Sequence, residues 1–175
     1  LVGCSSLAVW DNKSEDKGLL IGRNFDFYAN DDFAKNKIIS FVKPDRGFPY
    51  MSVTWGGMIG VSSGMNLEGL TVTINAGKSS IPLKAKTPIS LVALEILQYA
   101  STIDEAIEIA KNKKVFVSES IMVGSQKDHR AVLIEISPKK FGVYRVQNQS
   151  YLACTNHFQS EGYRDDTRNN RQQKE

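Results

Sequence analysis

The chain is poor in the residues on which most metal and redox sites depend. It has two histidines and two cysteines among 175 residues. His129 and His157 lack the spacing of a zinc motif, and Cys4 and Cys154 do not form a Cys-x-x-Cys pair. Two distant cysteines can join in one disulfide, but they do not make a disulfide framework. The sequence therefore predicts neither a metal site nor a cofactor.

Long apolar runs and strong charge are also missing. No apolar stretch approaches the roughly 20 residues that a membrane-spanning helix needs. The net charge is only +3, and the basic residues form no stripe interleaved with aromatic residues, so nucleic acid is not expected as a partner. The apolar share of 41% and the length of 175 residues suit one globular domain with a real core.

Strand patterns dominate both ends of the chain, and two helix patterns lie between them. Thr87 is predicted to cap a first helix, with Pro88 in its first turn, and Thr102 with Glu105 has the capping-box pattern of a second. From Gly162 onwards apolar side chains are almost absent, which predicts a solvated tail or a surface helix. The order predicts a layered α+β fold with mainly antiparallel sheets. Strands are predicted over residues 5–10, 19–27, 37–42, 50–55, 58–62, 70–76, 116–123, 131–137, 141–147 and 151–155.

Cys4 follows Gly3 at the start of a predicted strand. A thiol is only a few per cent ionised at neutral pH and needs a base. If the Gly3–Cys4 bond were cut, the new α-amino group, with an ordinary pKa of about 7.7 to 8, would supply that base. Gly3 would also permit a strained turn at this bond. The alternative is that Cys4 is simply a small buried residue.

Arg23 and Asp26 lie in the strand that is predicted to pair with the one carrying Cys4. Arg23 can stabilise a thiolate, and Asp26 can orient an α-ammonium group. In an alternating strand their side chains point to opposite faces, so a twist or bulge is needed to bring both to one site. The alternative is a surface ion pair, which is common and worth little.

Four short segments occur in the order of a known superfamily, namely residues 3–6, 22–26, 64–70 and 155–158. Together they resemble the choloylglycine hydrolase and acyl-coenzyme A:isopenicillin-N acyltransferase superfamily of N-terminal-nucleophile hydrolases. The likeness is closer to the acyltransferase branch, with acid ceramidase as a more distant relative, and it covers nearly the whole chain. It implies a four-layer αββα fold and autoproteolysis at Gly3–Cys4.

The same resemblance implies roles for five site residues. Cys4 would be the nucleophile and, through its amine, the base, while Arg23 and Asp26 would line the thiol. Asn75 and Asn156 match positions that help to form an oxyanion hole, where donors are worth about 3 to 4 kcal/mol each. Taken alone, both asparagines are also ordinary turn or loop residues. The implied reaction is hydrolysis or acyl transfer at a linear, non-peptide amide C–N bond, without cofactor or metal.

Two departures from the family pattern concern the ends of the chain. Residues 1–3 are still attached to Cys4, so its amine is acylated, and these residues are expected to be a residual pro-segment. The family has a further catalytic arginine, and Arg164, Arg168 and Arg171 follow the Thr-Asn-His motif too closely to match it. Residues 1–175 are therefore expected to form a single domain truncated at the C-terminus. Its expected partners are its own cleaved segment, its missing C-terminal part and a small-molecule amide or acyl substrate, with a homo-oligomer as a further option.

Two other functions stay open. Leu1-Val2-Gly3-Cys4 also fits the lipidation site of a non-enzymatic surface lipoprotein anchored at Cys4. A conventional thiol hydrolase would instead use Cys4 with His157 as its base.

The substrate stays open among bile-acid amides, penicillins and N-acyl amines, since loops around the site set specificity in such folds. The sequence does not fix the localisation and only weakly favours an extracytoplasmic location in a bacterium. Four residues are candidates for the wall of an acyl pocket, although core packing explains them equally well: Tyr28, Phe33, Trp55 and Met65.

Overall fold

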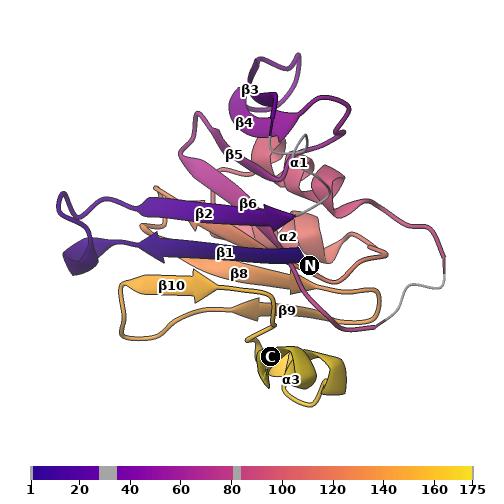
Figure 1. Ribbon diagram of the computed structural model, residues 1–175. Coiled ribbons are helices and arrows are strands. Elements are labelled where there is room, and N and C mark those ends of the chain that lie inside the picture. The colour runs from indigo at the N-terminus through magenta and orange to yellow at the C-terminus, as the bar shows by residue number, and fades with distance from the viewer. Residues whose placement is uncertain (1, 28–34, 81–83, 175) are drawn as a thin grey trace.

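The computed structural model describes residues 2–27, 35–80 and 84–174, which form two antiparallel sheets and three α-helices (Figure 1). The predicted α+β fold with mainly antiparallel sheets is confirmed. The strands are β1 (Val2–Val9), β2 (Leu20–Phe27), β3 (Lys37–Val42), β4 (Tyr50–Trp55), β5 (Ser63–Asn66), β6 (Leu70–Ala76), β7 (Glu119–Ser125), β8 (Arg130–Ile136), β9 (Phe141–Tyr144) and β10 (Tyr151–Cys154). The helices are α1 (Ile89–Tyr99), α2 (Ile103–Lys111) and α3 (Thr167–Lys174), with 3₁₀ turns η1 (Asp11–Lys13) and η3 (Glu161–Tyr163).

The larger sheet has the strand order β3-β4-β5-β6-β7-β8-β9, so each strand pairs with the strands next to it in the sequence. The connection from β6 to β7 carries α1 and α2. At the β5–β6 turn, Asn66 accepts hydrogen bonds from the main-chain N–H groups of Glu68 (3.1 Å) and Leu70 (3.0 Å). Gly69 supplies the positive φ of 77° in this turn. The turn leads into β6, the middle strand of the sheet, which carries Asn75.

One predicted strand is wrong. Residues 58–62 do not form a strand, and β5 begins at Ser63 instead. Gly57 and Gly60 have φ values of 83° and 88°, which lie outside the extended region. A Cβ atom on Gly60 would lie only 2.5 Å from the carbonyl group of Ser90. The loop therefore packs too closely against the start of α1 for an extended conformation, whatever its strand propensity.

The smaller sheet has the order β10-β1-β2, so β1 is its central strand. β1 and β2 form the predicted hairpin in a regular register, from Val2 opposite Phe27 to Val9 opposite Leu20. The pairing with β10 reaches only to Ser6. The main chain of β1 ahead of Ser6 is therefore open, on that side, to the residues that follow β10.

The two sheets pack face to face, and α1 and α2 cover the opposite face of the larger sheet (Figure 1). Ala8, Met122 and Leu133 are fully buried in the core between the sheets. Val72 and Ile96 are fully buried in the core between the larger sheet and the helices. Burial of such side chains is the main favourable term in folding. The described residues thus supply three layers: helices, sheet and sheet.

The helix α2 begins at the predicted capping box. The main-chain N–H of Glu105 donates to the Thr102 hydroxyl at 3.3 Å, and the Thr102 N–H donates to the Glu105 carboxylate at 3.2 Å. For α1 the predicted cap is wrong by one residue, because Pro88 is the N-cap and Thr87 instead forms a parallel bridge with Val115. In the part of the chain that the structure describes, no helix is long and apolar enough to cross a bilayer.

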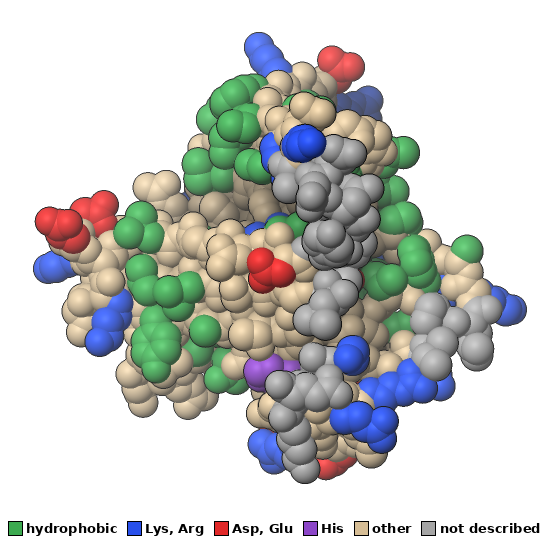
Figure 2. Space-filling model, in the orientation of Figure 1, with side chains coloured by type: hydrophobic (Ala, Val, Ile, Leu, Met, Phe, Trp, Pro, Cys, Tyr) green, Lys and Arg blue, Asp and Glu red, His purple; other side chains and the backbone are tan. Residues whose placement is uncertain are grey.

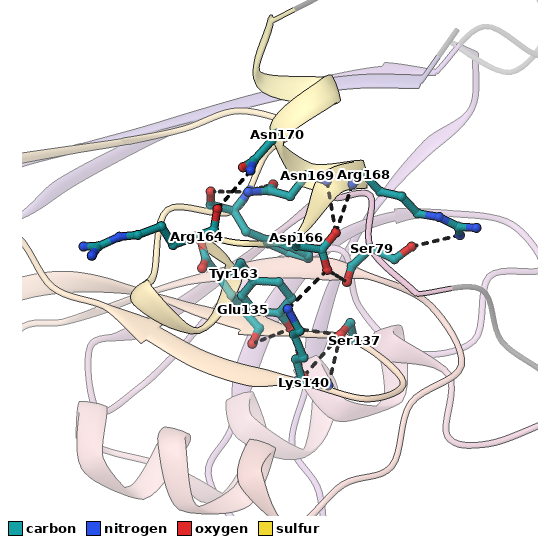
Figure 3. Close-up of polar contacts among 11 residues, drawn as sticks. Ser79, Glu135, Ser137, Lys140, Tyr163, Arg164, Asp166, Arg168, Asn169 and Asn170 are labelled. Carbon is teal, nitrogen blue, oxygen red and sulfur yellow. Dashed lines mark hydrogen bonds and ion pairs between the residues drawn. The ribbon is translucent and has the colours of Figure 1, made fainter.

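The C-terminal segment is anchored more firmly than its polar composition indicates. It forms the surface helix α3, one of the two predicted outcomes. Tyr163 is fully buried, and its hydroxyl donates to the carbonyl of Lys140 at 2.8 Å and lies 3.0 Å from the Ser137 hydroxyl (Figure 3). The buried Asn169 side chain is hydrogen-bonded to both the N–H and the carbonyl of Phe158. The segment therefore holds the loop that follows β10.

Candidate active site

Cys4 lies in the central strand of the smaller sheet, opposite Phe25 of β2. Its side chain is 5% exposed and lines a cavity of about 430 Å³ between the sheets and the start of α1. Gly3 lies in extended β1 and does not have a positive φ, so the strained turn suggested for this position is absent. Both cysteines are free thiols, and burial raises the pKa of Cys154 to about 12. Cys4 is therefore the thiol that faces a cavity, and Cys154 is a buried core residue.

Asn156 holds the main chain of Cys4. The N–H of Cys4 donates a 2.9 Å hydrogen bond to Oδ1 of Asn156, and Nδ2 of Asn156 donates to the carbonyl of Ala76 at 2.8 Å. This residue thereby joins the loop after β10 to β1 and to the end of β6. A primary amide carries two N–H donors, so one N–H of Asn156 is left for another acceptor.

Arg23 contacts the Cys4 thiol from β2. Its Nη2 lies 3.8 Å from Sγ of Cys4 and donates to the carbonyl of Ile74, while Nη1 donates to the Ser63 hydroxyl at 3.1 Å. The guanidinium group also lies 4.4 Å from the centre of the Phe25 ring. Burial lowers the pKa of Arg23, and the nearby Cys4 opposes that shift. The group remains a cation, which favours the thiolate form of a neighbouring thiol.

Asp26 lies beside the Gly3–Cys4 peptide bond, on the other face of the β1–β2 hairpin from Arg23. It lies opposite Gly3 in the β1–β2 register, and its Oδ2 would be 3.8 Å from a Cβ atom on Gly3. The register shows no bulge at Arg23 or Asp26, so the expected distortion is wrong. It is not needed, because Cys4 and Gly3 are neighbours that face opposite sides of β1. Arg23 reaches the thiol on one side while Asp26 lies beside the Gly3–Cys4 peptide on the other.

Asn75 lies close to this group but is enclosed between the two sheets. Its side chain is 0% exposed, accepts a 2.8 Å hydrogen bond from the Ser6 hydroxyl, and donates to the carbonyl of Cys154 at 3.3 Å. It does not line the cavity beside Cys4. The side chain of Asn75 thus ties β6 to β1 and β10, and its part in an oxyanion hole stays a prediction.

The cavity beside Cys4 has an almost wholly apolar wall, which suits an acyl group. Of the predicted pocket residues, Trp55 lines it, whereas Tyr28 and Phe33 lie outside the described residues. The hydroxyls of the two serines in the wall donate to main-chain carbonyls elsewhere. The other described lining residues are Phe25, Met58, Ser62, Ile74, Ala76, Ile89, Ser90 and Glu119.

Met65, the fourth predicted pocket residue, does not line this cavity. It is 46% exposed and lies beside Met51, which in turn lies opposite the exposed Phe41. Figure 2 shows hydrophobic side chains gathered at this β3–β5 end of the molecule. Exposed apolar patches of this kind commonly lie at contact surfaces. Met65 therefore belongs to an outer surface rather than to the candidate site.

Glu119, at the start of β7, is a site residue that the sequence analysis missed. It lies opposite Ala76 in the β6–β7 register and faces the cavity. Burial raises the pKa of Glu119 to about 7, and the Arg23 guanidinium opposes that shift. The only signal in the sequence is a lone acidic residue before the apolar run that follows it. The register with β6 is needed to place that residue near Cys4.

Glu135 is a second missed residue, and it supports the loop that carries Asn156. Its carboxylate is fully buried and accepts hydrogen bonds from the N–H groups of Gln159 (2.6 Å) and Ser160 (2.8 Å). Burial raises the pKa of Glu135, and the hydrogen bonds from this loop oppose the shift. Figure 3 shows Glu135 beside Tyr163, below the helix α3. The loop that carries Asn156 is therefore held from one side by Glu135 of β8 and from the other by Asn169 of α3.

His157 is turned to a different partner. Its Nδ1 lies 2.9 Å from the hydroxyl of Thr155, and the residue does not line the Cys4 cavity. Among the described residues, no group of three or more His, Cys, Asp and Glu side chains gathers within reach of one metal ion. The chemistry available at the site is therefore that of a thiol beside a guanidinium, an amide and two carboxyl groups.

Solved structures of amide hydrolases share this fold. The Caenorhabditis elegans ortholog of N-acylethanolamine-hydrolyzing acid amidase aligns with a TM-score of 0.72 at 23% identity, over 98% of this chain and 78% of that one. A mutant of the conjugated bile acid hydrolase from Clostridium perfringens aligns with a TM-score of 0.61 at 19% identity, over 85% and 52% of the two chains. The predicted N-terminal-nucleophile hydrolase fold is confirmed, and this chain is a part of it.

Sequence comparisons agree with the fold. An uncharacterized protein of Archaeoglobus fulgidus is 27% identical over 150 residues, which are 81% of this chain and 24% of that protein. The chain thus spans about a quarter of this curated relative. The model of the acyl-coenzyme A:6-aminopenicillanic acid acyl-transferase family matches residues 10–174, a stretch that begins after Cys4 and includes the four other predicted site residues. Since the match takes in nearly the whole chain, this protein belongs to the acyl-coenzyme A:6-aminopenicillanic acid acyl-transferase family.

Proposed function

We propose that this chain is the nucleophile-bearing part of an enzyme that hydrolyses or transfers acyl groups at linear, non-peptide amide bonds, with Cys4 as its nucleophile. One observation carries this assignment. Asn156 accepts a hydrogen bond from the Cys4 N–H at 2.9 Å while Arg23 contacts the Cys4 thiol at 3.8 Å, at the wall of an apolar cavity. The two groups of Cys4 that would act as base and nucleophile are thus held together in one place.

The first step is maturation at the Gly3–Cys4 bond. Sγ of Cys4 attacks the carbonyl carbon of Gly3, the C–N bond breaks, and the thiol proton passes to the leaving nitrogen. Water then hydrolyses the thioester, which frees the thiol and releases residues 1–3 as a pro-segment that ends in a carboxylate. Asp26 lies beside Gly3 and would orient the new ammonium group. Asn156 already accepts a hydrogen bond from this nitrogen.

Turnover uses the amine that maturation creates. The amine takes the thiol proton, and the thiolate, stabilised by Arg23, attacks the carbonyl carbon of the substrate amide. A donor N–H of Asn156, and Asn75 if its side chain becomes accessible, would stabilise the tetrahedral oxyanion. The ammonium then protonates the leaving nitrogen as the C–N bond breaks. Water or an acceptor amine resolves the thioester and restores the free thiol.

The organisation of the whole protein is part of the proposal. Residues 1–175 would be a single domain that is completed by a C-terminal part and paired with its cleaved segment. The exposed apolar side chains at the β3–β5 end, such as Phe41 at 81% exposure, fit a surface that another part of the protein covers. A homo-oligomer would cover it equally well.

The two rival functions gain little support. A lipid anchor on Cys4 needs an accessible thiol, and this thiol is 5% exposed within a strand. A Cys-His hydrolase needs His157 near Cys4, and the only hydrogen bond of the His157 ring within the described part of the chain is to Thr155.

The test is the intact mass of the full-length gene product that carries this chain, here called the parent chain, followed by amide turnover. Cleavage at Gly3–Cys4 is expected in the parent chain, absent in Cys4→Ala and retained in the matched control Cys154→Ala. The processed chain is then incubated with a bile-acid conjugate, an N-acylethanolamine and a penicillin, substrate types taken from the family description and the similar structures. Amide turnover by a Cys4→Ala variant would contradict the proposal. Loss of turnover in His157→Ala, in a chain whose Cys4 amine is free, would favour the Cys-His alternative.

A further inference from the structure

The carboxyl group of Glu119 is the one charged side chain among the described residues that line the Cys4 cavity. It enters at the start of β7, opposite Ala76, whose carbonyl accepts the hydrogen bond from Asn156. The rest of the wall is apolar apart from Cys4 and two serines that donate to main-chain carbonyls. A group bound in this cavity beside Cys4 would therefore meet the carboxyl of Glu119.

This carboxyl group has no hydrogen-bond donor among the residues that the structure describes. Arg23 acts on it only as a nearby charge, while the two terminal nitrogens of its guanidinium group donate to Cys4, Ser63 and Ile74. A half-buried carboxylate that no described donor compensates costs stability, and apolar residues of similar size would avoid that cost. The position is better explained by a group that enters the cavity and supplies the missing donor.

We propose that Glu119 is a specificity-determining residue, whose carboxyl selects an acyl group bearing a hydrogen-bond donor, above all a cationic amine. The inference rests on the proposed function, since it assumes that the cavity takes the acyl part of the substrate. An ammonium group would neutralise the charge of the carboxylate within a mostly apolar cavity. A carboxylate in the same place would face a like charge and is selected against.

The experiment compares three amides of one fluorogenic amine that differ only at the far end of the acyl chain. The hexanoyl amide ends in a methyl group, the ε-aminocaproyl amide in an ammonium group, and the adipoyl amide in a carboxylate. At about pH 8 the amine is protonated and Glu119 is ionised. The parent chain is expected to cleave the ε-aminocaproyl amide with a kcat/KM at least about tenfold above that of the adipoyl amide.

In Glu119→Gln that ratio should fall by at least about tenfold, because the amide keeps the size of the side chain and removes its charge. Cleavage of the hexanoyl amide should be equal or faster. Glu15→Gln, in an exposed turn, is the matched control and should leave all three rates unchanged. An unchanged ratio in Glu119→Gln would overturn the inference.

A binding measurement separates this inference from the proposed reaction. In the Cys4→Ala chain, which cannot react, ε-aminocaproamide and hexanamide are titrated while the fluorescence of Trp55 in the cavity wall is followed. The Cys4→Ala chain should bind ε-aminocaproamide more tightly than hexanamide, and the Cys4→Ala, Glu119→Gln double variant should lose this preference. That result supports the role of Glu119 even if no amide is turned over. Equal binding of both ligands in both chains overturns it, and absent turnover with selective binding counts against the proposed reaction alone.

Discussion

Replacement of Asn156 is the sharpest test of how this site is built. In Asn156→Ala the Cys4 N–H loses its 2.9 Å acceptor and the Ala76 carbonyl loses its 2.8 Å donor. Each such bond contributes about 0.5 to 1.5 kcal/mol net, so the loss is about 1 to 3 kcal/mol. This is smaller than the about 5 to 15 kcal/mol that holds a typical domain folded. The variant is therefore expected to fold, with a lower melting temperature.

The effect on catalysis should be larger than the effect on stability. If the remaining N–H of Asn156 faces the oxyanion, its loss lowers kcat by about 10² to 10³, or about 3 to 4 kcal/mol. Asn156→Asp keeps an acceptor for the Cys4 N–H but has no amide donor, and it places a carboxylate near Asp26. We therefore expect Asn156→Asp to be at least as inactive as Asn156→Ala.

The assay is kcat at saturating amide for both variants, together with the melting temperature and the rate of release of residues 1–3. Asn170→Ala is the matched control, because its side-chain amide donates to the carbonyl of Arg164 on the helix α3 side of the molecule (Figure 3). A kcat for Asn156→Ala within about threefold of the parent would refute the reasoning, since a lost oxyanion donor costs far more.

Three further predictions concern the Cys4 thiol, the half-buried carboxyl of Glu119 and the C-terminal anchor. Arg23→Met should slow alkylation of Cys4 by iodoacetamide near neutral pH, because it removes the guanidinium group that lies 3.8 Å from the reacting sulfur. Glu119→Gln should raise stability at about pH 8 by up to about 3 kcal/mol, the equivalent of a pKa raised from 4.5 to about 7. The folded state binds the extra proton, so this gain should develop between about pH 4.5 and 7 and vanish below it in thermal unfolding. Asn169→Ala should lower the melting temperature by the loss of two hydrogen bonds to Phe158, about 1 to 3 kcal/mol, and lower kcat by loosening the Asn156 loop.

Each of these has a matched comparison. Cys154 is buried with a pKa of about 12, so alkylation near neutral pH reports Cys4, and an unchanged rate in Arg23→Met would count against the role of the guanidinium. For Glu119, a stability difference that is the same at pH 5 and pH 8 would contradict the linkage argument. For Asn169, Arg171→Ala in the same helix should change neither quantity.

Features set by neighbouring residues could be predicted from the sequence. The capping box of Thr102 and Glu105 is a contact within four residues, and it is present as expected. The strand predicted over residues 58–62 failed for the opposite reason. There the packing of Gly60 against Ser90, a residue 30 positions away in the sequence, decides the conformation. Local propensity does not record such a contact.

The candidate site shows the same contrast between what the sequence predicts and what only long-range contacts decide. The resemblance named Cys4, Arg23 and Asn156, which the structure brings together, but it gave no way to rank Glu119 or Glu135 among the other acidic residues. Glu119 owes its position to the strand register opposite Ala76, and Glu135 owes its role to a hydrogen bond from the loop after β10. Glu119 matters because it enters the cavity beside Cys4, and Glu135 matters because it accepts the N–H groups of the loop after β10. Both properties belong to the folded chain.

The geometry around Cys4 also bears on what maturation changes. In the uncleaved chain the Cys4 nitrogen already donates to Asn156, and Arg23 already contacts the thiol. An amide nitrogen has no basicity at neutral pH, whereas the α-amine titrates near pH 8. Cleavage would therefore supply the base without rebuilding the oxyanion side or the acyl cavity. It follows that an uncleaved chain should bind an acyl amide in the cavity about as well as the mature one and fail only in turnover. Binding that appears only after cleavage would mean that release of residues 1–3 opens the site instead.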